Sequence, residues 1–166
     1  MLVDEYSIRK SKVTLIYNPV DTTRFNSNNK IPTTKQTGIF VGEVLDPIRF
    51  KSVCHLVSQC IENDWDLKIM SESKYNFNHP NITYVDRTWY TENVLKKVDF
   101  TAGILLGRTT LEGWCCDLPG FMYIIDKNGD IVDIQSQPPD NIKQLCDSVY
   151  VAKQHIALYE QIINKH

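Results

Sequence analysis

The stretch from Gly107 to Gly120, which reads GRTTLEGWCCDLPG, holds the residues whose types and spacing best suit a chemical role. It lies between two apolar runs of strand length, 99–106 and 121–125. We therefore expect a strand, a tight turn, a short helix and a second strand. Backbone N–H groups and the positive end of the helix dipole at such a helix start favour a phosphate ligand. The candidate ligand-binding residues share the start of this helix: Gly107, Arg108, Thr109, Thr110 and Glu112.

The same residues also fit a purely structural role. The pattern Thr109-x-x-Glu112 matches a capping box, in which the two side chains satisfy each other's backbone donors. On local pattern alone the capping box is the simpler interpretation, because helix caps are common. The two interpretations are compatible, so the wider pattern of the chain has to decide.

A second candidate anion site follows the apolar run 37–41. Gly42 ends this run, and the strongest predicted helix of the chain starts a few residues later, with Arg49 and Lys51 in its first turns. Arg49 would neutralise a diphosphate held near Gly107 if its side chain points back over the strand ends. Alternatively, both basic residues lie on a solvated helix face, which is the simpler interpretation of Lys51.

Other kinds of site have little support in the sequence. No histidine has a carboxylate or a cysteine at a spacing typical of a metal site or a catalytic triad. The glycines form neither a dinucleotide fingerprint nor a P-loop. The cysteines are odd in number and include no C-x-x-C pair, which favours reduced thiols in a cytosolic protein. We therefore expect no metal and no catalytic triad.

Composition restricts the class of protein. The 166 residues suffice for a single domain, with 42% hydrophobic and 23% charged residues as in soluble globular proteins. A formal net charge of −2 gives no basic surface for nucleic acid, so no nucleic-acid partner is expected. No apolar run is long enough to span a membrane, and the first ten residues are too polar for a signal peptide.

Strand and helix patterns alternate along the chain. The predicted strands are 13–17, 37–41, 64–70, 81–85, 99–106, 121–125 and an edge strand at 131–134, and the predicted helices are 47–61, 88–97, 138–146 and 151–164. Apolar spacing predicts that helix 47–61 buries Phe50, Val53, Cys54, Val57, Cys60 and Ile61, and that the last helix buries Ala152, Ile156, Tyr159, Ile162 and Ile163. This alternation predicts an α/β fold, a doubly wound, Rossmann-like parallel sheet with helices on both faces.

Five segments, taken in order, resemble one family. VTLIYNPVDTTRF at 13–25 resembles the opening of the C-terminal domain of retaining nucleotide-sugar glycosyltransferases of GT-B architecture. TGIFVG, DLKIM and NITYVD look like the strands that follow, and GRTTLEGWCCDLPG looks like the family's G-x-x-x-L-E-A-M-A-C-G-x-P segment. The order and spacing agree over roughly residues 10–126, and five motifs in order are more specific than any one alone.

The resemblance implies a single donor-binding domain over residues 1–166. Residues 1–10 would be a linker or the end of a missing N-terminal acceptor domain. The whole enzyme would transfer a sugar from a nucleotide-diphosphate sugar to a glycan or lipid-linked acceptor in polysaccharide biosynthesis, and this chain alone would be incomplete or inactive. It would be cytoplasmic, and it would contact the inner face of a membrane only through the acceptor or the missing half.

The resemblance also implies roles for individual residues. Glu112 would accept hydrogen bonds from the ribose, and Thr109 and Thr110 would hold the diphosphate. Arg49 would neutralise the leaving group without any metal or other cofactor, and the backbone of 84–86 would hold the base.

The sequence departs from the family at four positions. Ile104 stands where the family has the first glutamate of E-x7-E, and Glu43 stands where it has arginine. Arg49 falls one position later than the family's lysine, and Asp117 replaces a glycine, although Asp tolerates the left-handed conformation. These departures favour one alternative, a non-catalytic or degenerate nucleotide-binding or interaction module of the same fold. An unrelated flavodoxin-like regulatory domain is a third alternative, but the acidic cluster that it would need at the strand ends is not found.

Overall fold

One mostly parallel sheet organises the fold. The computed structural model describes residues 13–43, 46–72 and 77–164, and in this part of the chain six strands pair in the order β3-β2-β1-β4-β5-β6. Strands β1 to β5 are parallel, and β6 is antiparallel to β5. The strands are β1 (Thr37–Val41), β2 (Asp66–Met70), β3 (Ile82–Tyr84), β4 (Phe100–Gly103), β5 (Gly120–Ile125) and β6 (Ile131–Ser136). The expectation of a linker at 1–10 lies outside the described residues.

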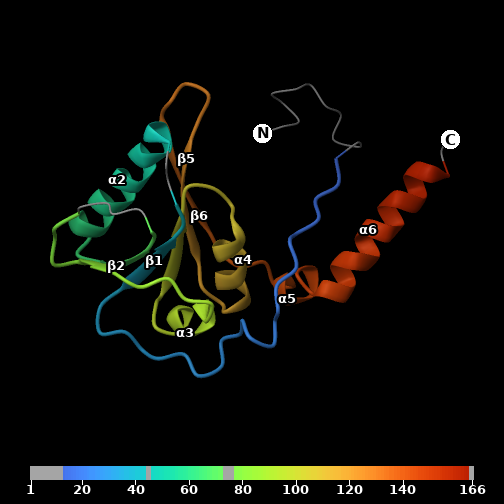
Figure 1. The fold of residues 1–166 in the computed structure, drawn as a ribbon, viewed down its shortest axis with the longest axis horizontal. Helices are drawn as coiled ribbons and strands as arrows, with labels where there is room; N and C mark the ends of the chain where they lie inside the picture. Colours follow the sequence, from blue (N-terminus) through green and yellow to red (C-terminus); the bar gives the residue numbers. More distant parts are fainter. Residues whose placement is uncertain (1–12, 44–45, 73–76, 165–166) are drawn as a thin grey trace.

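Helices cover both faces of this sheet (Figure 1). They are α2 (Pro47–Glu62), α3 (Thr91–Leu95), α4 (Arg108–Cys115), α5 (Ile142–Leu145) and α6 (Ser148–Ile163). Val53 and Leu56 of α2 belong to the apolar cluster on one face. Leu95, Trp114 and Ile142, from α3, α4 and α5, belong to the cluster on the other face. The predicted doubly wound α/β fold is therefore confirmed.

Helix α2 forms as its apolar spacing predicts. The predicted stripe is buried or half-buried at five positions: Phe50, Val53, Cys54, Val57 and Cys60. Ile61 is exposed instead, and Leu56 is buried in its place. The buried stripe is therefore rotated slightly from the predicted one, because the face of α2 over the sheet also includes Leu56.

The predicted strand at 13–17 does not form. This segment runs beside the helices on the α4 side of the sheet (Figure 1), where no strand is available to pair with it. Tyr17 packs edge-on against Trp114 of α4, with ring centroids 6.5 Å apart. Further along, the Val20 N–H donates to the Cys146 carbonyl oxygen at 2.9 Å. The segment is therefore held by helices and loops rather than by the sheet.

Three other predicted elements are clearly shorter than expected, and one of them is the helix predicted at 138–146, which is reduced to α5. The helix predicted at 88–97 is reduced to α3, and the strand predicted at 99–106 ends at Gly103. Leu105 and Leu106 are exposed, because the chain leaves the sheet there and turns toward the start of α4. An unbroken apolar run therefore overestimated the length of the central strand.

The apolar face predicted for the last helix is exposed. Helix α6 begins where the Asp147 carboxylate accepts hydrogen bonds from two backbone N–H groups of its first turn, and the helix then projects away from the sheet (Figure 1). Val151 is buried near its start. The other predicted core residues are exposed: Ala152, Ile156, Tyr159, Ile162 and Ile163. Spacing correctly predicted the helix, but no described part of the chain covers that face.

Close packing fixes the position of α4 on the sheet. A Cβ atom added at Gly113 would lie 2.4 Å from Cγ2 of Thr101 in β4, and one added at Gly120 would lie 2.8 Å from Cγ2 of Thr110. Both glycines therefore allow α4 to approach the strands more closely than a side chain would permit. Asp117, just past the end of α4, has a φ of 59°, the left-handed conformation that the family's glycine would adopt.

We expect Gly113→Ala to lower the free energy of unfolding by about 1–3 kcal/mol, the usual cost of overpacking a core. Contact with the Thr101 methyl group should outweigh the gain of about 1 kcal/mol in helix propensity. Urea unfolding measures the change, and adding Thr101→Ser, which removes that methyl group, should recover part of the loss. A Gly113→Ala variant as stable as the wild type would contradict this packing.

We expect Ile156→Gln and Ile163→Gln to change the free energy of unfolding by less than about 0.5 kcal/mol, because both side chains are already exposed. Val151→Ala is the matched control on the same helix, and the loss of buried apolar area should cost about 1–3 kcal/mol. Urea unfolding of the three variants is the measurement. A large loss for either isoleucine variant would show that the apolar face of α6 is covered in solution.

Candidate functional site

A cavity of about 650 Å³ lies at the carboxyl ends of the parallel strands. Val41 and Met70, the last residues of β1 and β2, form part of its wall, and Arg108 and Thr109 contribute the start of α4. Beyond β1 the strand order reverses, because β2 lies on one side of it and β4 on the other. Such a reversal opens a crevice where open α/β sheets bind ligands.

The N-terminus of α4 at this cavity has no side-chain cap. Gly107 is the N-cap residue, in an extended conformation with φ −113° and ψ −178°, and in the described part of the chain it leaves the first turn without a side-chain cap. The predicted capping box is therefore wrong, since Thr109 and Glu112 both lie inside the helix. The turn at Gly107 also needs no left-handed φ. The first backbone N–H groups of α4 thus lack an intrahelical acceptor, as at every helix start, and can bind an anion.

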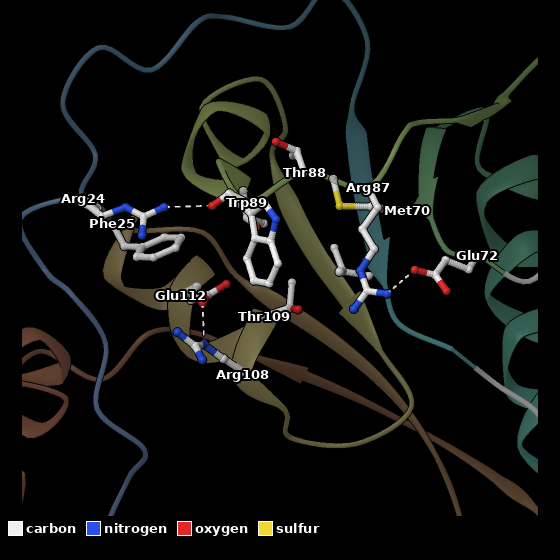
Figure 2. A pocket seen from close by; sticks show the side chains of 12 residues that line it. Arg24, Phe25, Met70, Glu72, Arg87, Thr88, Trp89, Arg108, Thr109 and Glu112 are labelled. Carbon is white, nitrogen blue, oxygen red and sulfur yellow. Dashed lines mark hydrogen bonds and ion pairs between the residues drawn. The ribbon is translucent and has the colours of Figure 1, made fainter.

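Three arginines, each paired with a glutamate, surround the cavity among the described residues (Figure 2). Arg108 Nε donates to Glu112 Oε1 at 2.8 Å, and Arg24 Nη2 donates to Glu92 Oε2 at 2.8 Å. The third pair joins Arg87 Nη1 to Glu72 Oε1. These side chains come from separate segments of the chain, so the fold concentrates guanidinium groups at the rim of a single crevice.

Glu112 is the buried charged group of this site. Its side chain is only 9% exposed, whereas that of its partner Arg108 is 72% exposed. Burial raises the pKa of Glu112 above its ordinary value, and the hydrogen bond from Arg108 and the charges of Arg108 and Arg24 oppose that rise. The carboxyl group therefore lines the cavity with reduced hydration, where a hydrogen bond from a ligand would be strong.

Two aromatic side chains complete the site. Phe25 is buried in the cavity wall, whereas Trp89 is 92% exposed on the loop between β3 and α3. The indole ring stands between the Arg24–Phe25 side and the Arg87–Met70 side of the cavity (Figure 2). The cavity therefore combines guanidinium groups, a helix N-terminus and a flat apolar surface.

The structure brings some of the predicted site residues together. Arg108, Thr109 and Glu112 line the cavity. Gly107 immediately precedes them as the N-cap of α4. Thr110 is buried and lies on the side of α4 that packs over Gly120 of β5.

The predicted second anion site lies apart from this cavity. Gly42 has a positive φ of 153°, and its N–H donates to the Met70 carbonyl oxygen, but it is not among the lining residues. Arg49 is exposed, with Nε 4.0 Å from Oδ2 of Asp46, which directly precedes α2, and it does not line the cavity either. Lys51 Nζ donates to the Gly129 carbonyl oxygen in the β5–β6 turn.

Two departures from the family pattern have clear structural positions. Ile104, which replaces a sugar-binding glutamate, packs against the apolar cluster under α2. The Glu43 carboxylate accepts a hydrogen bond from the Glu72 N–H, so it helps to hold the glutamate that pairs with Arg87. The carboxylate at Glu43 therefore stabilises the backbone of the loop beside the cavity.

Sequence reasoning missed Arg24, Arg87 and Trp89. Arg24 and Phe25 lie within the 13–25 motif, but nothing in its spacing indicated that Arg24 faces the start of α4. Arg87 and Trp89 follow β3 directly, so their place after the carboxyl end of a predicted strand was the available signal.

Comparisons with known proteins identify no relative of this chain. No protein-family model and no curated protein matches this chain. Among the described residues, no group of three or more His, Cys, Asp or Glu side chains is arranged to hold a metal ion. None of the described helices has both the length and the apolar composition of a membrane span.

The raised pKa of Glu112 predicts a pH-dependent stability. Because the folded protein binds this proton more tightly than the unfolded chain, stability should fall as pH rises from the ordinary pKa of 4.5 through the folded pKa. Glu112→Gln cannot ionise, so its stability relative to the wild type should increase across that range. Urea unfolding of both proteins from pH 4 to pH 8 tests this, and a relative stability that declines with pH would show that the Arg108 ion pair dominates burial.

Proposed function

We propose that this chain is the donor-binding domain of a glycosyltransferase and holds a nucleotide-diphosphate sugar in the cavity beside α4. The observation that carries the proposal is the N-terminus of α4, which has no side-chain cap and opens on a 650 Å³ cavity rimmed by arginines. A diphosphate there would accept backbone hydrogen bonds and neutralise guanidinium charge. The five ordered motifs of the glycosyltransferase resemblance support the same ligand.

The Arg87–Glu72 pair suits exchange with an anionic ligand. Arg87 and Glu72 are both 67% exposed, and such surface ion pairs contribute about 0–1 kcal/mol. A phosphate group offers a guanidinium two parallel, charge-assisted hydrogen bonds, so it can replace the carboxylate at little cost. In the absence of ligand, Glu72 would keep Arg87 positioned at the rim.

In the transfer reaction, the bond between the sugar carbon and the phosphate oxygen breaks, and the electron pair stays on the departing diphosphate. The acceptor hydroxyl oxygen forms a new bond to that carbon, and its proton passes to a phosphate oxygen of the departing diphosphate. The α4 dipole and Arg108 would stabilise that developing charge. The acceptor would be bound by a further, N-terminal domain, so this chain alone should bind donor but transfer nothing. We place the protein in the cytoplasm, with membrane contact only through a lipid-linked acceptor or that other domain.

One observation favours the alternative, a module that binds a nucleotide without transferring a sugar. Ile104 is half-buried and packs against an apolar cluster, where the resemblance expects a carboxylate for the donor sugar. Such a module would hold the diphosphate but grip the sugar weakly. Activity of the chain joined to an N-terminal acceptor domain would separate the two functions.

Calorimetric titration with UDP and GDP tests the proposed site. We expect one of them to bind the wild-type chain, and Arg108→Ala to weaken binding by about tenfold through loss of a charge-assisted hydrogen bond. Glu112→Ala should weaken binding as well, because it removes the buried acceptor that would meet the ribose.

Arg49→Ala is the matched control. It removes an exposed guanidinium that lies outside the cavity, so binding should stay within about twofold of the wild type. Circular dichroism should show all three variants folded. Binding of neither diphosphate, or equal losses for Arg49→Ala and Arg108→Ala, would overturn the proposed site.

A further inference from the structure

Trp89 is the most exposed large apolar side chain in the described part of the chain, at 92%. The other two tryptophans are placed differently, because Trp114 is buried and Trp65 is partly buried against Phe100 and Phe121. An indole ring left in water forgoes a large gain from burial, which is a common property of aromatic side chains that cover a ligand. Because Trp89 lies on the rim of the cavity, the ligand that its ring would cover is the one bound in that cavity.

Hydrogen bonds hold the backbone of the loop at Trp89 and at the residue that follows it. The Trp89 carbonyl oxygen accepts from Arg24 Nη2 at 2.9 Å, and the same guanidinium pairs with Glu92 in the first turn of α3. The Tyr90 N–H donates to Thr88 Oγ1 at 3.1 Å, which closes the local turn. A backbone fixed in this way reduces the conformational entropy lost when the ring binds a ligand.

The surroundings of the ring define the ligand. Figure 2 shows the indole above Thr109 of α4, between Arg24 on one side and Arg87 on the other. The backbone N–H groups at the helix start and the guanidinium groups favour a phosphate ligand, and the flat face of the indole favours stacking with a planar aromatic ring. Inorganic diphosphate or a sugar phosphate would satisfy only the first requirement, whereas a nucleoside diphosphate satisfies both.

Part of the 84–86 segment, to which the glycosyltransferase resemblance assigns the base, is already engaged in other hydrogen bonds. The Val85 N–H donates to the Ile69 carbonyl oxygen at 2.9 Å, and the Tyr84 hydroxyl accepts from the Phe77 N–H. These groups of the 84–86 segment are therefore not free to hold a base. Trp89 offers a different means of holding it, a few residues further along the same loop.

We propose that Trp89 stacks on the base of a nucleoside diphosphate whose phosphates lie at the start of α4 between Arg108 and Arg87. This inference rests on the proposed function, because it assigns the base-binding residue of that same site. Stacking depends little on the identity of the base, so Trp89 would supply affinity for nucleotides in general.

The test compares two probes on three variants by calorimetry. The probes are inorganic pyrophosphate and the better-binding of UDP and GDP, and the variants are Trp89→Ala, Trp89→Phe and Tyr90→Ala. We expect Trp89→Ala to weaken nucleoside diphosphate binding by about 5- to 150-fold, the range for loss of a stacking aromatic, and to leave pyrophosphate binding within about twofold. Trp89→Phe should keep most of the affinity, since a phenyl ring also stacks.

Tyr90→Ala is the matched control, because Tyr90 is a neighbouring, 64% exposed aromatic residue that does not line this cavity. It should change neither affinity. Since both side chains are exposed, the variants should fold, and circular dichroism verifies this. If the nucleoside diphosphate binds wild type and Trp89→Ala equally, the inference is overturned and the proposed phosphate site stands. If wild type binds neither probe, the proposed function fails and the inference fails with it.

Discussion

The close contact of α4 with β4 and β5 is the constraint on which the site depends. Gly113 and Gly120 carry no side chain, so Thr101 and Thr110 fill the space where a Cβ would lie. This contact fixes the axis of α4, and with it the direction of the backbone N–H groups that precede Leu111. The strand order reverses between β1 and β4, because β2 and β3 lie on one side of β1, whereas β4 and β5 lie on the other. The start of α4 therefore faces a crevice rather than another helix.

Paired charges at the rim determine the electrostatics of this crevice. The guanidinium groups at its rim are held by carboxylates, so positive charge is positioned before any ligand arrives. Glu112 differs from the exposed Glu72 because its side chain is buried and its pKa is raised. An exposed ion pair can exchange its partner at little cost in free energy. A buried carboxyl group is stabilised more strongly by a well-aligned hydrogen-bond donor, because the local dielectric constant is low. A ligand with phosphates at one end and hydroxyl groups nearby fits both properties.

Much of the fold was predictable because its signals are local. Apolar runs between turn residues predicted strands β1 to β5, and the spacing of Val53, Val57 and Cys60 predicted α2. Tertiary context determined the rest: residues 13–17 have strand-like composition but no strand beside them, and α6 has helical spacing but no described partner. For the site, the start of α4 was predictable from the turn before Arg108. The roles of Arg24 and Trp89 depend on contacts between distant segments, which no local pattern reveals.

The central claim is that the start of α4 holds the phosphates of a nucleotide. Amide-resolved NMR during titration with UDP or GDP tests it most directly, because it locates the ligand without any substitution. The account predicts that the largest shifts fall on the amides of Arg108, Thr109 and Thr110, together with the indole N–H of Trp89. Binding that shifts instead the amides of α2 and the β5–β6 hairpin, and leaves the start of α4 unperturbed, would contradict it.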